Sequence, residues 1–209
     1  EKALGLGLRV VDPAIRPIPT GLKMVGRAHT VQCHNDFLAA VRGLDEAAAG
    51  EVLVIDSQGS ERAVSGGLFP TEALRKGLAG IVNDGPCRDT AAVRTLGFPY
   101  YARSVNCQAG STFHPGATQV PISCGGVPVE PGDVLVGDDD GIVVGTAALL
   151  AELVPLAEQI RATEGGLVEQ MAAGQSLTRM MNLEEHLQAL ADDRPSTLQF
   201  RVPPPGQTR

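Results

Sequence analysis

The stretch from Ser65 to Asp89 constrains the fold of this 209-residue chain more than any other part of the sequence. It opens with a Ser-Gly-Gly turn, and Pro70 then stands early in a segment of helical character, where proline is favoured. Gly77 is a suitable helix end, and the apolar run 78–82 has the length of a strand. The next four residues, Asn-Asp-Gly-Pro, are typical of a tight turn. This order predicts a glycine turn, a short helix, a buried strand and a second turn.

Each of the two turns meets a predicted helix start. Gly66 and Gly67 precede the first helix, and Asp89 is expected to be the N-cap of a second helix over 90–96. Helix starts carry free backbone N–H groups that attract anions, and Arg88 adds a guanidinium beside the Asp89 carboxylate. The set predicts a site for an anionic ligand, with a divalent cation as a bridge. The plainer alternatives are an ordinary N-cap, a simple glycine turn, and an arginine that pairs with the carboxylate at position 84.

Composition narrows the class of protein. Hydrophobic residues make up 43% of the chain and charged residues 20%, which is typical of a globular protein with a sizeable core. The formal net charge of −7 disfavours direct contact with nucleic-acid phosphates, and the absence of Trp leaves few platforms for base stacking. No apolar run approaches the roughly 20 residues of a membrane span. We therefore expect no direct binding to nucleic acid or membranes, although an acidic chain suits a basic protein partner.

The cysteines and the absence of a signal-peptide pattern indicate a cellular compartment. The four cysteines are widely separated and form no Cys-x-x-Cys pair, which is typical of reduced thiols rather than of disulfides or a metal–sulfur site. No signal-peptide pattern is visible. These observations predict a cytoplasmic protein with four free thiols, namely Cys33, Cys87, Cys107 and Cys124.

Hydrophobic periodicity divides the chain into four parts. We predict an irregular N-terminal arm over 1–22, a mixed α/β core over 23–145, a helical extension over 146–191, and a strand-like segment with a tail over 192–209. Within the core we expect a helix over 37–49 that Asn35-Asp36 caps, and strands over 23–32, 51–55, 98–102, 120–123, 126–129, 134–136 and 141–144. The acidic run 138–140 lacks the ligand spacing of a calcium loop and predicts a hairpin turn.

The predicted helical extension contains residues that break or cap helices. Pro155 predicts a kink or a restart in a helix over 147–163, and Gly165-Gly166 predicts its end. Asn182 begins a capping-box pattern for a last helix to about residue 191, and 197–202 has strand character. A helical arm after a compact body is a common way to reach a neighbouring subunit, so we expect a homo-oligomer.

Several segments carry a resemblance to a known family. They are VGRAHTV (25–31), GEVLVIDSQG (50–59), GGLFPTEALRKGLAGIVNDGPCRD (66–89), LGFPYYAR (96–103) and VPISCGGVPVEPGDVLVGDDDGIVV (120–144). Together they resemble the RraA-like family, which contains regulator of ribonuclease E activity A and the 4-hydroxy-4-methyl-2-oxoglutarate / 4-carboxy-4-hydroxy-2-oxoadipate aldolases. The resemblance implies a swivelling β/β/α domain with a mixed central sheet, assembled as a homotrimer or homohexamer with sites at subunit interfaces.

The resemblance also implies roles for residues in the 66–89 segment. In the aldolases the arginine of the Arg-Asp pair, here Arg88, holds the pyruvyl end of the substrate, and the aspartate, here Asp89, ligates Mg²⁺ or Mn²⁺. The implied activity is a metal-dependent retro-aldol cleavage or decarboxylation of a 4-hydroxy-2-oxo diacid or related 2-oxo acid, with release of pyruvate. His114 is a further candidate, as an acid/base or for the distal carboxylate, and a solvated loop histidine is the alternative. Backbone donors are expected around Gly66, Gly67, Leu68 and Phe69.

One position departs from the aldolase pattern. The aldolases carry an acidic residue where this chain has Gly67, and loss of such a supporting carboxylate typically weakens metal affinity or activity by roughly 10–100-fold. Asp84 or Glu164 of a neighbouring subunit is a possible substitute; otherwise the chemistry has changed or is lost. Two alternatives follow: a non-catalytic regulator that binds a ribonuclease, and an enzyme of related fold that acts on another sugar-acid or aromatic-degradation intermediate.

Overall fold

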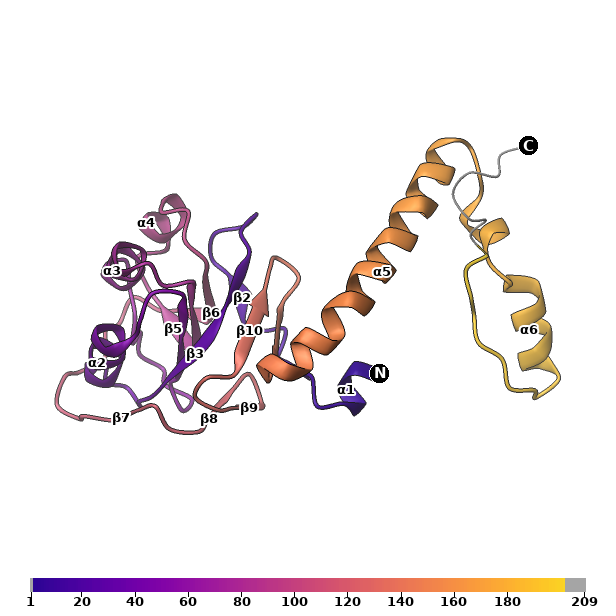
Figure 1. Ribbon diagram of the computed structural model, residues 1–209. Helices are drawn as coiled ribbons and strands as arrows, with labels where there is room; N and C mark the ends of the chain where they lie inside the picture. The colour runs from indigo at the N-terminus through magenta and orange to yellow at the C-terminus, as the bar shows by residue number, and fades with distance from the viewer. Residues whose placement is uncertain (1, 202–209) are drawn as a thin grey trace. The chain divides into compact units, whose positions relative to one another are not determined.

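The structure, a computed structural model, describes residues 2–201. The chain divides into two compact units, Glu1–Leu150 and Ala151–Arg209. The first unit is built on a nine-stranded mixed sheet, and the elements of the second are helical (Figure 1). The predicted α/β fold with a mixed central sheet and C-terminal helices is confirmed.

Four parallel strands form the centre of the sheet. Neighbouring strands are joined in parallel register in chain order, and the apolar run 52–55 is fully buried, as expected for a strand that is covered on both faces. These strands are β3 (Met24–Gln32), β4 (Glu51–Asp56), β5 (Gly80–Cys87) and β6 (Tyr100–Val105).

Antiparallel strands extend the sheet on both sides. β10 (Val134–Gly137) pairs with β3 and forms the predicted hairpin with β11 (Ile142–Gly145), around the acidic turn. The segment expected to be an irregular N-terminal arm instead contributes β1 (Arg9–Val10) beside β11 and β2 (Arg16–Pro17) beside β6, after a short helix α1 (Lys2–Gly5). β7 (Ala117–Thr118) also pairs with β3, outside the linear order of the other strands.

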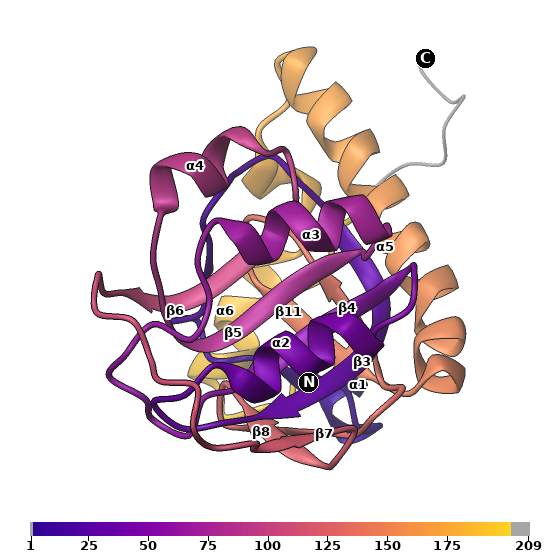
Figure 2. The ribbon, with the colours of Figure 1, turned by 90° about the vertical axis from the view of Figure 1, so that its left-hand side faces the viewer.

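The two faces of the sheet are covered differently. Three helices, α2 (Leu38–Glu46), α3 (Leu68–Lys76) and α4 (Thr90–Thr95), pack on one face, as Figures 1 and 2 show. The hairpin of β8 (Ile122–Cys124) and β9 (Val127–Val129) contributes to a second apolar cluster. Aliphatic side chains dominate both clusters, as the low aromatic content requires.

The turn predicted at 83–86 is wrong, because β5 continues through it to Cys87. Asn83 pairs with β4, Pro86 pairs with β6, and the register shifts between these two residues. A shift of this kind accommodates a proline that has no N–H for the ladder. Gly85 is required for a different reason: a Cβ there would lie 2.0 Å from the Ser57 hydroxyl oxygen. The residues at 83–86 therefore form a bulge within β5, and β5 leads directly to Arg88.

The helical extension also differs from its prediction in detail. α5 (Ala147–Ala172) runs through both Pro155 and the glycine pair at 165–166, each glycine costing only about 1 kcal/mol in a helix. After η1 (Leu177–Met180), α6 (Leu183–Ala191) begins where expected, but Asn182 does not cap it. The Asn182 side chain instead bonds the backbone of Thr197 and Gln199.

The segment after α6 differs from its prediction. Of the strand expected over 197–202, the described residues 197–201 form only a bridge between Phe200 and Met181. The tail expected after residue 202 lies outside the described residues. No helix of the described chain combines the length and apolarity that a membrane crossing requires.

Candidate functional site

Arg88 and Asp89 lie where β5 ends and α4 begins. The backbone N–H of Arg88 donates to the carbonyl oxygen of Ser65 at 3.2 Å, and Ser65 forms a β-bridge with Cys87. The end of β5 is therefore laid against the glycine turn that precedes α3. The two helix starts that the sequence places in this stretch come together in space.

Asp89 occupies the position before α4 but does not cap it. Its backbone is left-handed, with φ of 59°, and its side chain makes no bond to the first turn of α4. The Oδ2 atom instead accepts the backbone N–H of Gly67 at 3.0 Å. The predicted N-cap is thus correct in position and wrong in its hydrogen bond. A left-handed backbone at a non-glycine residue costs free energy and is concentrated at functional sites.

Gly66 is needed because Arg88 and Asp89 approach it closely. A Cβ at Gly66 would lie 2.6 Å from Asp89 Oδ2 and 2.8 Å from Arg88 Cγ. Gly67 is under no such constraint: its φ is −57°, and a Cβ there would lie 3.3 Å from the Asp89 Cβ. The position that departs from the aldolase pattern therefore admits a side chain after a small shift of Asp89.

The expected set of backbone donors is partly used within the protein. The N–H of Phe69 donates to the Gly66 carbonyl at 3.1 Å, and the N–H of Gly67 donates to Asp89. These bonds form the turn itself, so in this conformation both N–H groups have partners within the protein. The side chain of Leu68 is 82% exposed. Beside the turn, a cavity of about 10 Å³, enough for one water, is lined by Phe37, Ala63, Val64, Ser65, Gly66, Phe69 and Arg88.

The Asp89 carboxylate suits a hydrated divalent cation. It is 53% exposed, and Arg88 Nε lies 3.7 Å from its Oδ2 atom. No group of three or more acidic, histidine or cysteine ligands occurs among residues 2–201. Mg²⁺ commonly takes one or two carboxylates and keeps several waters, so a single exposed aspartate is a compatible donor set.

Asp84 is committed elsewhere. Its Oδ1 atom accepts the Arg103 guanidinium and its Oδ2 atom accepts the N–H of Gly125 at 2.6 Å. Arg103 also bonds Asp12 at 3.0 Å. This network joins β5 and β6 to the β8–β9 hairpin and the N-terminal segment, so Asp84 neither pairs with Arg88 nor substitutes for the missing acid at position 67.

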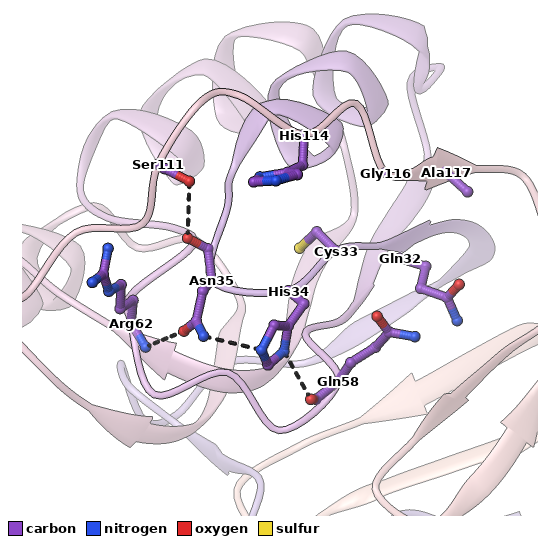
Figure 3. Close-up of a pocket in the computed structure, with 10 residues that line it drawn as sticks. All are labelled: Gln32, Cys33, His34, Asn35, Gln58, Arg62, Ser111, His114, Gly116 and Ala117. Carbon is purple, nitrogen blue, oxygen red and sulfur yellow. Dashed lines mark hydrogen bonds between the residues drawn. The ribbon is translucent and has the colours of Figure 1, made fainter.

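His114 lies in a different and larger pocket, shown in Figure 3. The pocket has a volume of about 730 Å³ and follows the carboxyl ends of β3 and β4. The structure therefore separates His114 from Arg88 and Asp89, which line no part of this pocket. The sequence does not mark the other members of this wall, because they come from three distant segments, around residues 32–35, 58–62 and 111–117. The lining residues are Gln32, Cys33, His34, Asn35, Gln58, Arg62, Ser111, His114, Gly116 and Ala117.

Asp36 holds one side of this pocket in place. Its side chain is only 1% exposed, and its Oδ1 atom accepts the N–H of Leu38, the first residue of α2. The N-cap is Phe37, so the cap predicted at 35–36 lies one residue too early. Its Oδ2 atom accepts Ser111 Oγ at 2.7 Å and the N–H groups of Phe113 and His114 at 2.6 and 3.0 Å. Burial by itself raises the pKa of Asp36, but these hydrogen bonds outweigh it and lower the pKa well below its usual range.

Comparison with known proteins establishes the family. A family model described as Aldolase/RraA matches residues 2–144. The chain belongs to the RraA-like family. It is 41% identical over 140 residues to a protein of Halalkalibacterium halodurans named "Putative 4-hydroxy-4-methyl-2-oxoglutarate aldolase", covering 66% of this chain and 67% of that relative.

Solved structures of RraA-like proteins share the fold. The RNA-processing inhibitor RraA from Thermus thermophilis is 30% identical with a TM-score of 0.63, covering 68% of this chain and 87% of its own. RraAS2 of Streptomyces coelicolor, described as an unusual member of the RNase ES inhibitor RraA protein family, is 34% identical with a TM-score of 0.69, covering 78% and 86%. Relatives of this RraA-like chain thus carry both aldolase and ribonuclease-inhibitor names.

Proposed function

We propose that this RraA-like protein is a divalent-metal-dependent lyase that cleaves or decarboxylates a 4-hydroxy-2-oxo diacid or a related 2-oxo acid and releases pyruvate. The observation that carries the proposal is the exposed Asp89 carboxylate beside the Arg88 guanidinium, at a glycine turn that accommodates both. The aldolase name of the Halalkalibacterium halodurans relative supports the reaction class.

The residues present divide the work in a definite way. Asp89 would hold Mg²⁺ or Mn²⁺, which supplies Lewis-acid stabilisation of negative charge on the 2-oxo group when bound. Arg88 binds the substrate carboxylate through two parallel N–H bonds, a geometry that a lysine cannot reproduce. Gly67 donates to Asp89 Oδ2 and so fixes the orientation of the carboxylate. Gly66 has no side chain, which leaves the space that the Arg88 and Asp89 side chains occupy.

A pyruvate-release assay tests this proposal. Purified protein is incubated with 4-hydroxy-4-methyl-2-oxoglutarate or oxaloacetate, with Mg²⁺, with Mn²⁺ and with EDTA. We expect turnover with either metal, none with EDTA, and a loss of at least about 100-fold in Asp89→Asn. Asp45→Asn, at an exposed position on α2, is the matched control and retains activity. Background turnover under every metal condition would refute the lyase.

A second function is favoured by two observations. The chain carries a net charge of −7, and solved relatives are described as inhibitors of RNA processing or of a ribonuclease. A non-catalytic regulator would bind the basic region of a ribonuclease through its acidic surface. Salt-sensitive capture of a ribonuclease, equal in wild type and Asp89→Asn and without turnover of any 2-oxo acid, would identify this function. Turnover confined to another sugar acid or aromatic-degradation intermediate would indicate the third alternative.

Assembly is part of the same proposal. We expect a homotrimer or homohexamer, in which Glu164 of a neighbouring subunit is the candidate for the acid that Gly67 lacks. Light scattering measures the mass directly. If the protein is oligomeric and active, Glu164→Gln should lower activity without changing the mass, and a monomeric mass would exclude this role.

A further inference from the structure

The 730 Å³ pocket is separate from the Arg88–Asp89 site. None of its ten lining residues borders the small cavity beside the glycine turn. Its volume lies within the range of roughly 300–1,000 Å³ that is typical of small-molecule sites. It also follows the carboxyl ends of two adjacent parallel strands, β3 and β4, where open α/β sheets bind their ligands. Its position and size are those of a ligand site.

The charge of the lining is opposite to that of the chain. The walls include Arg62 and two histidines and no carboxylate, whereas the whole chain has a net charge of −7. Asp36 and Asp56, which adjoin the lining segments, are buried, with 1% and 9% exposure. Asp56 is engaged by the Gln32 carboxamide at 3.3 Å. A ligand in the pocket therefore meets one guanidinium, two imidazole rings and carboxamide groups.

Arg62 supplies an available positive charge. Its backbone N–H donates to the Asn35 carboxamide oxygen at 3.2 Å, which fixes the chain on which the side chain stands. Its guanidinium makes no ion pair with any residue of the described part of the chain. Figure 3 shows Arg62 and His114 at the border of the same pocket. An unpaired guanidinium in a concave polar site suits a carboxylate or phosphate.

His114 is oriented by the buried Asp36. Its Nδ1 atom lies 3.4 Å from Asp36 Oδ2, and its own backbone N–H bonds the same oxygen. The Nε2 atom is thereby left for a ligand, and the side chain is 79% exposed. His34 is fixed differently, between the Gln58 carbonyl at 3.1 Å and the Asn35 side chain at 3.0 Å, so both of its nitrogens are used.

We propose that this pocket binds a small anion that carries a carboxylate or phosphate group. The Arg62 guanidinium holds it, and His114 adds an Nε2–H donor in the imidazolium form, in which both ring nitrogens donate. The carboxamide of Gln58 and the Ser111 hydroxyl border the remaining space and suit hydroxyl or carbonyl groups of the same molecule. The site functions without the Arg88–Asp89 pair and without a metal.

Calorimetric titration of the full chain in EDTA tests the site, with malonate and inorganic phosphate in separate arms. We expect saturable binding of at least one probe, and the tighter arm identifies the preferred group. Arg62→Gln should weaken binding at least about tenfold and His114→Asn by a smaller factor. Arg161→Gln, at an exposed position of α5, should bind as wild type. Arg62→Lys, which keeps the charge without the planar fork, should fall between wild type and Arg62→Gln.

Three results would overturn the proposal. They are the absence of saturable binding of both probes, unchanged binding in Arg62→Gln, and equal loss in Arg161→Gln. Thermal melting of each variant excludes misfolding, and Arg62 is exposed, so its replacement leaves the core intact. Because EDTA removes any metal, binding in this experiment is independent of lyase activity, and either proposal can fail alone.

Discussion

Asp89 accepts the backbone N–H of Gly67 at 3.0 Å, although the two residues precede different helices, α4 and α3. The bond joins two helix starts and turns the aspartate away from its own helix. It also brings the Arg88 side chain over Gly66. The geometry of the candidate site therefore depends on the absence of a side chain at position 66 more than on any ion pair.

Replacement of Gly66 by alanine should disable the site. The new Cβ would lie 2.6 Å from Asp89 Oδ2 and 2.8 Å from Arg88 Cγ, so both side chains must move. A displacement of about 1 Å can cost roughly 100-fold in rate, and we expect a loss of that size in kcat/KM for pyruvate release. The strain should also lower stability by about 1–3 kcal/mol, measured by urea unfolding.

Gly165→Ala is the matched control for this substitution. A Cβ at position 165 meets nothing within 4 Å, and the residue lies inside α5. We expect unchanged activity and a gain of up to about 1 kcal/mol in stability, since alanine is the better helix former. Full activity in Gly66→Ala would contradict the proposed close packing.

An acid restored at position 67 should raise activity. Gly67 has a helical φ of −57°, and its Cβ position is 3.3 Å from the nearest atom, the Asp89 Cβ, so a small shift admits a side chain. We expect Gly67→Glu to increase kcat/KM with Mg²⁺ by about tenfold, the scale on which supporting carboxylates act. Gly67→Gln adds the same bulk without charge and should give no increase. An equal response of the two variants would assign the effect to shape alone.

Arg88→Lys should weaken substrate binding. Lysine keeps the charge but loses the planar pair of N–H donors that matches a carboxylate. We expect KM for the 2-oxo acid to rise about tenfold, from steady-state kinetics at saturating Mg²⁺. Arg75→Lys is the control, because Arg75 pairs with Glu72 on the exposed side of α3. An unchanged KM in Arg88→Lys would remove Arg88 from the binding site.

Asp36 should make stability depend on pH in the acid range. Its folded-state pKa is lowered below the ordinary value of 3.8, so its stabilisation is present above about pH 4 and is lost as the pH falls further. At pH 7 we expect Asp36→Asn to reduce the free energy of unfolding by about 2 kcal/mol, the scale of hydrogen bonds to a charged group. The variant should also lose part of the acid dependence.

Urea unfolding between pH 7 and 2 measures both effects. Asp45→Asn, at an exposed position, should retain the wild-type slope. Parallel pH profiles for wild type and Asp36→Asn would show that Asp36 is not the group responsible.

Local patterns predicted much of the fold. The apolar run in β4 and the helix end at Gly77, which has the left-handed φ of 75°, follow directly from residue type. The turn residues at 83–86 misled, because bulged strands and turns use the same residues and only the neighbouring strands decide between them. The side-chain bonds of Asp89 and Asn182 were equally hidden, since each goes to a distant segment rather than to its own helix.

The candidate site was predictable in part for the same reason. Arg88, Asp89 and Gly66 adjoin two helix starts that the sequence predicts. Their proximity in space could therefore be predicted. The larger pocket joins segments around residues 33, 58, 62 and 114, and such long-range contacts leave no local signal. His114 is a candidate from the sequence because a loop histidine can act as an acid or base, whereas nothing in the sequence marks Arg62.

The four contacts on Asp36 Oδ2 have a consequence for how this region can vary. All of them come from residues 111–114, while Asp36 itself stands at the start of α2, about 75 positions earlier. The conformation of residues 111–114 therefore depends mainly on their contacts with Asp36. Lengthening the chain on either side of 111–114 should leave His114 where it is. Asp36→Asn should loosen residues 113–114, while backbone bonds to Asn35 and Phe37 still hold Ser111.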